Sequence, residues 1–141
     1  MVFADLLIDL TIQFNGVVRR AASKLQLTAS QAYLIFIIPP NGISMSVLAF
    51  KLGIDNSTLT RNIQKLENSM LVARKGSSYD KRISNVFLTT LGKETAISLE
   101  NLLNEICLDI AEKLDLDIQN SLVEILEKLN WNMECLSEES Q

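Results

Sequence analysis

Apolar residues recur along most of the chain at the three- and four-residue spacing that is typical of amphipathic helices. In the helix predicted at residues 2–25, one face carries Leu6, Leu10, Phe14, Val17 and Ala21. From residue 90 onward two further apolar stripes appear, separated by a break around residues 114–117. The pattern predicts long helices at both ends of the chain. The rest of the chain is too small to bury the apolar faces of all these helices. The faces therefore favour a dimer interface over a helical layer within one chain.

A capping box predicts where the second helix begins. The hydroxyl of Thr28 can accept a hydrogen bond from the backbone N–H of Gln31, while the Gln31 side chain reaches back to the cap. We therefore expect a helix over about residues 29–37, which Pro39 and Pro40 end.

A helix-turn-helix is predicted directly after this helix. Ser44 or Ser46 caps a short helix that ends near residue 52, and Gly53 suits the left-handed position that closes a helix. Asp55 caps the next helix, over about residues 56–69. Two short helices joined by so tight a turn are typical of this motif.

The second helix of the motif has one apolar and one polar face. Its core-facing residues are Leu59, Ile63, Leu66 and Met70. The residues that point the opposite way, or lie beside that direction, are Ser57, Thr58, Arg61, Gln64, Lys65 and Asn68. Arginine can pair with guanine, glutamine with adenine, and serine or threonine with bases or phosphates. The polar face therefore predicts a surface that reads DNA, the alternative being an ordinary solvated helix face.

Two short runs of alternating or branched apolar residues predict a hairpin after this helix. The strands lie at residues 71–75 and 83–88, with turn-forming residues between them. The tip carries Asp80, Lys81 and Arg82, and we expect Asp80 to orient Arg82 through a local ion pair. The predicted fold class is mainly α with a small β wing, in which N- and C-terminal helices form a dimerisation lobe beside a winged helix-turn-helix.

Composition removes several classes of function. A chain of 141 residues with 48% hydrophobic residues is long enough to form one domain with its own core. It has no histidine, no glycine-rich phosphate loop and no arrangement of nucleophile and base, so we expect no enzyme, metal or cofactor. The longest apolar run, residues 32–38, is too short to span a membrane. The N-terminus lacks the basic start of a secretory signal, so we expect a cytoplasmic protein.

The charges are segregated along the chain, although the net charge is only −4. Residues 55–93 carry seven cations and three acids, whereas the last 48 residues carry two cations and twelve acids. Exposed charges more than about 10 Å apart are largely screened from one another at physiological salt. The basic middle segment can therefore attract a polyanion in spite of the acidic C-terminal segment.

Three fragments of the chain carry short motifs in a fixed order. LTASQAYLIF opens a helix with Leu-Thr-x-x-Gln, LAFKLGIDNSTLTRNIQKLENSMLVARK spans the helix-turn-helix and first wing strand, and YDKRISNVFLTTLGKE contains Asp-x-Arg and Leu-Thr-x-x-Gly. In this order and spacing they resemble the MarR (multiple antibiotic resistance regulator) family of winged-helix transcription regulators. The organisation expected is a single MarR-like domain over residues 1–141. Its DNA-binding lobe covers about 28–93, and its dimerisation lobe covers about 1–25 and 94–141.

The resemblance implies a homodimer that binds a pseudo-palindromic, double-stranded DNA operator. Each subunit would place its recognition helix in a major groove and its wing against the adjacent minor groove. The DNA-binding roles would fall on Ser57, Thr58, Thr60, Arg61, Gln64, Lys65, Lys81 and Arg82. Many members of the family repress transcription and are released by small, often phenolic anions.

Several routes of control remain open for such a regulator. The candidate residues for an anionic or aromatic effector are Asn15, Arg19, Tyr33 and Phe36, unless the aromatic rings belong to the core. Oxidation of Cys107 or Cys135 is an alternative, although neither has an adjacent cation to stabilise a thiolate. A further alternative is a winged-helix module that binds a protein through its acidic C-terminal helices.

The chain departs from the family at the end of the recognition helix, where Met70 stands in place of the usual glycine. A methionine in the left-handed conformation would cost roughly 1 kcal/mol. We therefore expect the helix end to be rearranged by about one residue, with Asn68 or Ser69 taking the turn instead of Met70.

Overall fold

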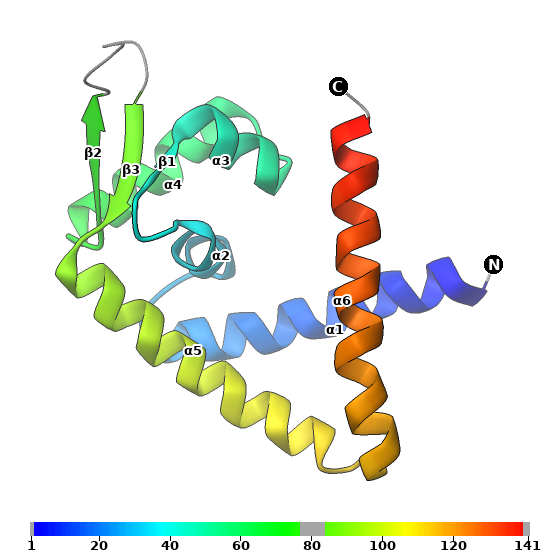
Figure 1. Cartoon of the computed structure of the whole chain (residues 1–141). Helices are drawn as coiled ribbons and strands as arrows, with labels where there is room; N and C mark the ends of the chain where they lie inside the picture. Colours follow the sequence, from blue (N-terminus) through cyan, green and yellow to red (C-terminus); the bar gives the residue numbers. More distant parts are fainter. Residues whose placement is uncertain (1, 77–83, 140–141) are drawn as a thin grey trace. The chain divides into compact units, whose positions relative to one another are not determined.

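The structure, a computed structural model, describes residues 2–76 and 84–139. In chain order its elements are α1 (Val2–Lys24), α2 (Ala29–Ile37), β1 (Ile43–Ser44), α3 (Met45–Leu52), α4 (Asn56–Asn68), β2 (Val72–Gly76), β3 (Ser84–Leu88), α5 (Thr90–Ala111) and α6 (Leu116–Glu139) (Figure 1). The chain divides into two compact units, Met1–Leu103 and Asn104–Gln141. The predicted fold class, mainly α with a small β wing, is confirmed.

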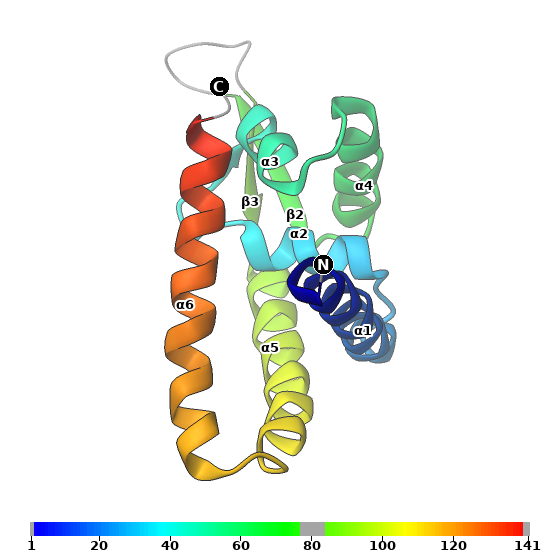
Figure 2. The same cartoon turned by 90° about the vertical axis from the view of Figure 1, so that its right-hand side faces the viewer.

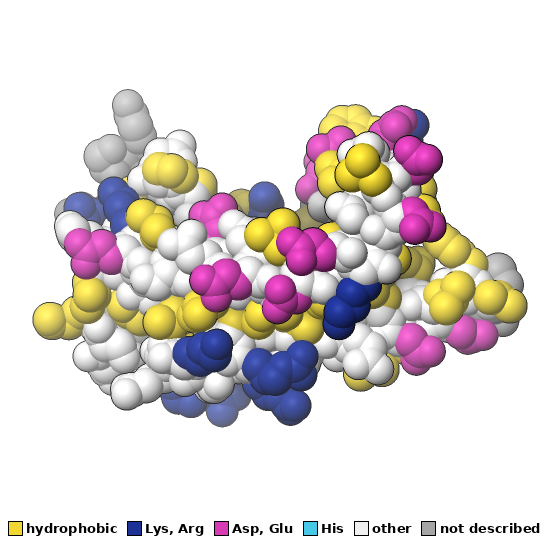
Figure 3. All heavy atoms as spheres, turned by 90° about the horizontal axis from the view of Figure 1, so that it is seen from below, with side chains coloured by type: hydrophobic (Ala, Val, Ile, Leu, Met, Phe, Trp, Pro, Cys, Tyr) yellow, Lys and Arg dark blue, Asp and Glu magenta, His cyan; other side chains and the backbone are white. Residues whose placement is uncertain are grey.

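α1 is buried only in its C-terminal half, where it packs against α2. The buried residues there are Val17, Val18, Ala21 and Ala22. Three residues of the predicted apolar face, Leu6, Leu10 and Phe14, are instead exposed. Figure 3 shows hydrophobic side chains at the N-terminal end of α1, at the right edge of the view. The helix is thus where the pattern predicts it, but half of its apolar surface is uncovered.

The predicted caps are confirmed. The Thr28 hydroxyl accepts from the backbone N–H of Gln31 at 3.2 Å, and the Gln31 side chain accepts from the Thr28 N–H at 2.9 Å. Ser44 caps α3, which ends at Gly53 in the left-handed conformation with φ of 62°. Together these signals define the start of α2 and both ends of α3 through residues that are close along the chain.

α4 supplies the centre of the core. The prediction that Met70 also faces the core is wrong, because its side chain is 63% exposed, whereas Leu59, Ile63 and Leu66 are fully buried, as the apolar stripe predicts. They belong to one cluster with Leu34 and Ile35 of α2, Leu48 of α3 and Val86 of β3. Because the apolar face of α4 packs against residues of α2, α3 and β3, the polar face of the helix points outward.

The prediction that the turn after α4 would avoid Met70 is wrong. Met70 has a φ of 59°, whereas Ser69 keeps a φ of −86°. The backbone N–H groups of Met70 and Leu71 donate to the carbonyls of Glu67 and Leu66, both at 2.9 Å. This is the Schellman pattern, which needs a left-handed residue at the position of Met70. Burial of Leu71 in the same cluster as Leu66 offsets the backbone strain at the methionine.

The three strands form an antiparallel sheet in the order β1-β3-β2. In β2 and β3 the pairing runs from Val72 opposite Leu88 to Gly76 opposite Ser84, which confirms the two predicted wing strands to within one residue. β1 was not predicted, because a strand of two residues shows no alternation. Figures 1 and 2 both show α5 leading away from the base of this hairpin.

The second unit contains the end of α5 and the whole of α6, and the break between these helices lies close to the predicted one. No described residue of α6 is buried, and several of its large apolar side chains are exposed, including Leu126 and Trp131. Cys107 of α5 and Cys135 of α6 are free and half-buried. Within the described ranges, no helix is both long and apolar enough to cross a membrane.

Candidate nucleic-acid interface

The outward face of α4 presents Arg61, Gln64 and Lys65 to solvent. Gln64 and Lys65 lie one turn after Arg61 on the same side of the helix, opposite the buried Leu59 and Ile63. Neither Arg61 nor Lys65 forms an ion pair with any residue that the structure describes. Their charges are therefore available to an external anion, and the planar fork of Arg61 can also pair with a base edge.

The N-terminus of α4 is organised around the carboxylate of Asp55. Its Oδ1 accepts from the backbone N–H of Thr58 at 2.8 Å and from the Ser57 hydroxyl at 2.7 Å, and its Oδ2 accepts from the Thr58 hydroxyl at 2.7 Å. These bonds hold the pKa of Asp55 well below its ordinary value of 3.8, the largest effect coming from the backbone N–H of Thr58.

The Asp55 network limits what the two neighbouring hydroxyls can do. Ser57 and Thr58 both commit their hydroxyl hydrogens to Asp55, so each retains only lone pairs for an outside partner. Thr58 is also half-buried, whereas Ser57 is exposed. The Thr60 hydroxyl, in turn, donates to the backbone carbonyl of Asn56 at 2.7 Å.

A hollow of about 350 Å³ lies between the starts of α3 and α4 and the wing strands. It is lined by Ser44, Met45, Ser46, Asn56, Thr60, Arg74 and Ser84. Of these, only Thr60 was predicted from the sequence as a DNA-contacting residue. The run Ser44-Met45-Ser46 at the start of α3 was a usable signal, but Arg74 and Ser84 reach the same place only through the fold.

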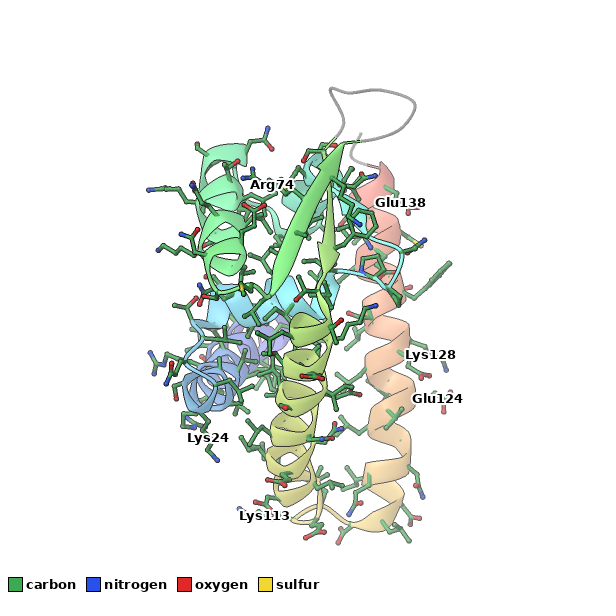
Figure 4. The ribbon with its side chains drawn as sticks, turned by 90° about the vertical axis from the view of Figure 1, so that its left-hand side faces the viewer. Lys24, Arg74, Lys113, Glu124, Lys128 and Glu138 are labelled. Atoms are coloured by element: carbon green, nitrogen blue, oxygen red, sulfur yellow. The ribbon has the colours of Figure 1, made fainter. Side chains whose placement is uncertain are left out.

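Arg74 of β2 forms a two-point ion pair with Glu67 in the last turn of α4. The Arg74 Nε and Nη2 donate to the two Glu67 carboxylate oxygens at 2.9 and 2.8 Å. Both side chains are about two-thirds buried or more, with 34% and 26% of their surface exposed. In Figure 4 the Arg74 side chain reaches from β2 toward α4. Hydrogen bonding to Glu67 raises the pKa of the Arg74 guanidinium, which stays charged.

The wing contributes one further described cation, Lys75. Its Nζ lies 5.4 Å from the centre of the Phe87 ring on the neighbouring strand, within the range of a cation–π contact. The predicted wing residues Asp80, Lys81 and Arg82 lie outside the described residues.

The four candidate effector residues come from two helices in contact. Tyr33 of α2 donates its hydroxyl to the Asn15 side chain of α1 at 3.1 Å, and partial burial raises the pKa of Tyr33. Arg19 is exposed, and Phe36 is 44% exposed. None of the four lines the hollow beside α4. In the part of the chain that the structure covers, no group of three or more Cys, Asp or Glu residues is arranged to hold a metal ion.

The known proteins that the chain resembles are transcription regulators. The MarR family pattern matches residues 25–83, which include α2, α3, α4 and β2. An uncharacterized HTH-type transcriptional regulator of Bacillus subtilis, YdgJ, is 25% identical over 122 residues, covering 86% of this chain and 71% of the relative. The apo structure of wild-type MarR from E. coli superposes with a TM-score of 0.78 at 26% identity, covering 89% of this chain and 94% of that one. A mutant of the same protein, in complex with operator DNA, gives a TM-score of 0.75 at 24% identity over 92% and 94% of the two chains.

Proposed function

We propose that the chain is a homodimeric repressor of the MarR family, which binds a pseudo-palindromic operator and is released by a small ligand. Such a regulator acts on chromosomal DNA, so we propose the cytoplasm as its compartment. The relatives that it resembles are regulators and not enzymes.

The observation that carries the DNA-binding proposal is the orientation of α4. Its apolar face is fixed in the core by Leu59, Ile63 and Leu66, so Arg61, Gln64 and Lys65 face outward together. In this proposal Arg61 and Gln64 contact base edges in a major groove, and Lys65 contacts a phosphate. Ser57, Thr58 and Thr60 lie along the same helix, and their free lone pairs suit donors on the DNA.

The similarity in fold to a mutant MarR that is bound to operator DNA supports the proposal that this chain also binds DNA. By the motif resemblance, Lys81 and Arg82 would contact the minor groove beside the major groove that α4 enters. A homodimer is supported by the uncovered apolar side chains of α1 and α6, which a second copy could bury.

The proposal is tested by selecting a binding site from random double-stranded DNA with the purified full chain, followed by titration over a range of salt. A dimeric DNA-binding protein should enrich an inverted repeat whose half-sites are one helical turn apart, or a multiple of one turn. The logarithm of the affinity should fall with the logarithm of the salt concentration, by about 0.9 for each phosphate contact. Selection of no sequence would reject DNA binding and favour a module that binds a protein partner.

The effector part of the proposal rests on Asn15, Arg19, Tyr33 and Phe36. A half-buried Tyr33 phenol, the adjacent Asn15 amide, the exposed Arg19 guanidinium and the exposed Phe36 ring together suit a small aromatic anion. Benzoate is a suitable probe, and it should weaken operator binding by the parent chain more than by the Arg19→Ala variant. Equal sensitivity of the two proteins would reject Arg19 as an effector contact.

A further inference from the structure

We propose that Glu67 and Arg74 are positioning residues, which hold the recognition helix and the wing at the one relative orientation that lets both contact DNA. This inference rests on the proposed DNA-binding function and adds two residues that do not themselves touch the DNA. Its starting point is the two-point ion pair between the last turn of α4 and the middle of β2.

The pair supplies a second connection between two elements that are otherwise joined by a short turn. Only residues 69–71 link α4 to β2, and that turn depends on a left-handed Met70. A single turn fixes where β2 starts, but it leaves the direction of the strand to side-chain packing. Glu67 precedes the turn and Arg74 follows it, so the ion pair is a second point of contact between α4 and β2. Two points of contact restrain the angle between the helix and the strand.

The restraint extends to the whole hairpin. Arg74 pairs across the sheet with Val86 of β3, which is fully buried in the cluster that also contains Leu66 of α4. An orientation imposed on Arg74 is therefore transmitted to both strands that carry the wing. Its planar fork is suited to this task, because a bidentate guanidinium–carboxylate pair defines an angle as well as a distance.

Charge placement also favours positioning over direct DNA contact. Glu67 is the only acid among residues 56–76, a segment that carries Arg61, Lys65, Arg74 and Lys75. If the segment served only to attract phosphates, an acid there would oppose it. The carboxylate instead neutralises Arg74, while Arg61 and Lys65 keep their charges toward solvent.

Three changes to the pair test the inference, in the full chain and with its selected operator. They are Glu67→Gln, Arg74→Lys, and the exchange Glu67→Arg with Arg74→Glu. Glu94→Gln is a matched control, because Glu94 lies on α5 and forms no ion pair with described residues. Thermal unfolding of each variant confirms that it is folded, and the affinity is then measured over a series of salt concentrations.

We expect Glu67→Gln and Arg74→Lys each to bind the operator about fivefold more weakly, although the first removes a negative charge and the second conserves the positive charge. The loss should be the same factor at every salt concentration, because fewer molecules hold the competent orientation while the number of phosphate contacts in the complex is unchanged. The exchanged pair should recover part of the loss, and Glu94→Gln should bind no more weakly than the parent.

A footprint separates positioning from a general loss of stability. If the wing loses its orientation, protection should weaken at the minor-groove positions flanking the site and persist at the major-groove positions that α4 covers. Operator binding by Glu67→Gln as tight as that of the parent would overturn the inference alone. So would a salt dependence steeper by about 0.9, which would mean that the freed Arg74 contacts a phosphate. A parent chain that selects no DNA would instead overturn the proposed function and this inference with it.

Discussion

Gly92, at the start of α5, lies directly against the backbone carbonyl of Leu71 at the start of the wing. A Cβ atom at residue 92 would overlap the Leu71 oxygen. The hydroxyl of Thr89 completes the junction, because it donates to the Met70 carbonyl at 2.6 Å and accepts from the Gly92 N–H at 3.0 Å. The Leu-Thr-x-x-Gly motif thus has a physical reason: threonine caps α5, and glycine lets that helix approach the end of the Schellman turn.

Gly92→Ala should therefore destabilise the protein by about 3 kcal/mol, since the obstacle is backbone and cannot move aside as a side chain would. Gly16→Ala is the matched control, because Gly16 is also inside a helix but a Cβ there meets only the end of the Arg20 side chain at 3.6 Å. That control should be neutral or stabilise by about 0.5 to 1 kcal/mol. Urea unfolding of both variants measures the difference, and similar effects at the two positions would contradict the close approach at Gly92.

Met70→Gly should stabilise the protein by about 1 kcal/mol, because glycine adopts the left-handed conformation without strain. Little packing is lost, since the methionine is 63% exposed. Ser69→Gly is the control: Ser69 has a φ of −86°, so glycine there brings only the entropy cost and should destabilise. Unfolding midpoints in urea decide the order, and a Met70→Gly variant less stable than the parent would show that the turn is not strained.

The parts of the fold that the sequence predicted are those decided by residues close together along the chain. Thr28 and Gln31 are three residues apart, and Asp55 bonds groups two and three residues away, so the starts of α2 and α4 were predicted correctly. Met70 was mispredicted because intrinsic preference argued against it, whereas burial of Leu71, a tertiary effect, decided the turn.

The missed features depend on contacts between distant residues. β1 exists because Ile43 pairs with Val86, more than forty positions later. Glu67 and Arg74 are seven residues apart, but one lies on a helix and the other on a strand. The periodicity of a single element therefore could not predict that they meet. The candidate interface was predictable where it depends on a single helix face, as for Arg61 and Gln64. The hollow beside α4 was not, since it is assembled from β1, α3, α4, β2 and β3.

Asp55 should make stability depend on acid pH. Because the folded state holds the pKa of Asp55 below its ordinary value of 3.8, the cap stabilises the protein fully above that value and loses its contribution as the pH falls further. Asparagine also caps helices but does not titrate there, so Asp55→Asn should lose less stability than the parent between pH 5 and strongly acid solution.

Urea unfolding of the parent and Asp55→Asn at a series of pH values checks this expectation. Asp9→Asn is the control for net charge, because Asp9 lies inside α1 and caps no helix end. If the stability difference between the parent and Asp55→Asn did not change with pH, the carboxylate network at the start of α4 would not be the source of the effect.

Arg61 and Lys65 should differ in what their removal does to DNA recognition. Arg61→Ala should cost about 1 to 3 kcal/mol of operator binding and relax the preference at one base position, because its fork can read a base edge. Lys65→Ala should weaken binding to all sequences alike and reduce the salt slope by about 1. Lys24→Ala, at the end of α1, controls for the loss of a cation elsewhere.

Site selection repeated with each variant distinguishes the two roles. An unchanged consensus for Arg61→Ala, with affinity equal to that of the parent, would show that the outward face of α4 is not the reading surface. A changed consensus for Lys65→Ala would instead show that Lys65, one turn further along the helix, contacts a base.

The exposed apolar side chains of α1 and α6 should be covered by a second copy of the chain. Leu10 on α1 and Leu126 on α6 are 54% and 46% exposed, and a lysine at either position would place an unpaired charge in such an interface. The cost, about 3 kcal/mol or more, would weaken the dimer by over a hundredfold. Leu10→Lys and Leu126→Lys should therefore sediment as monomers at concentrations where the parent is a dimer.

Val47→Lys provides the matched control for these dimer variants. Val47 on α3 is 46% exposed, but it belongs to the helix-turn-helix and not to the predicted dimerisation lobe. It should remain dimeric, which separates a specific interface from a general effect of adding charge. Because two half-sites are bound together only by a dimer, the two monomeric variants should also lose operator binding at low protein concentration and regain part of it as the concentration rises. A parent chain that sediments as a monomer would contradict the interface, and it would leave the apolar surface of α1 and α6 to a different partner.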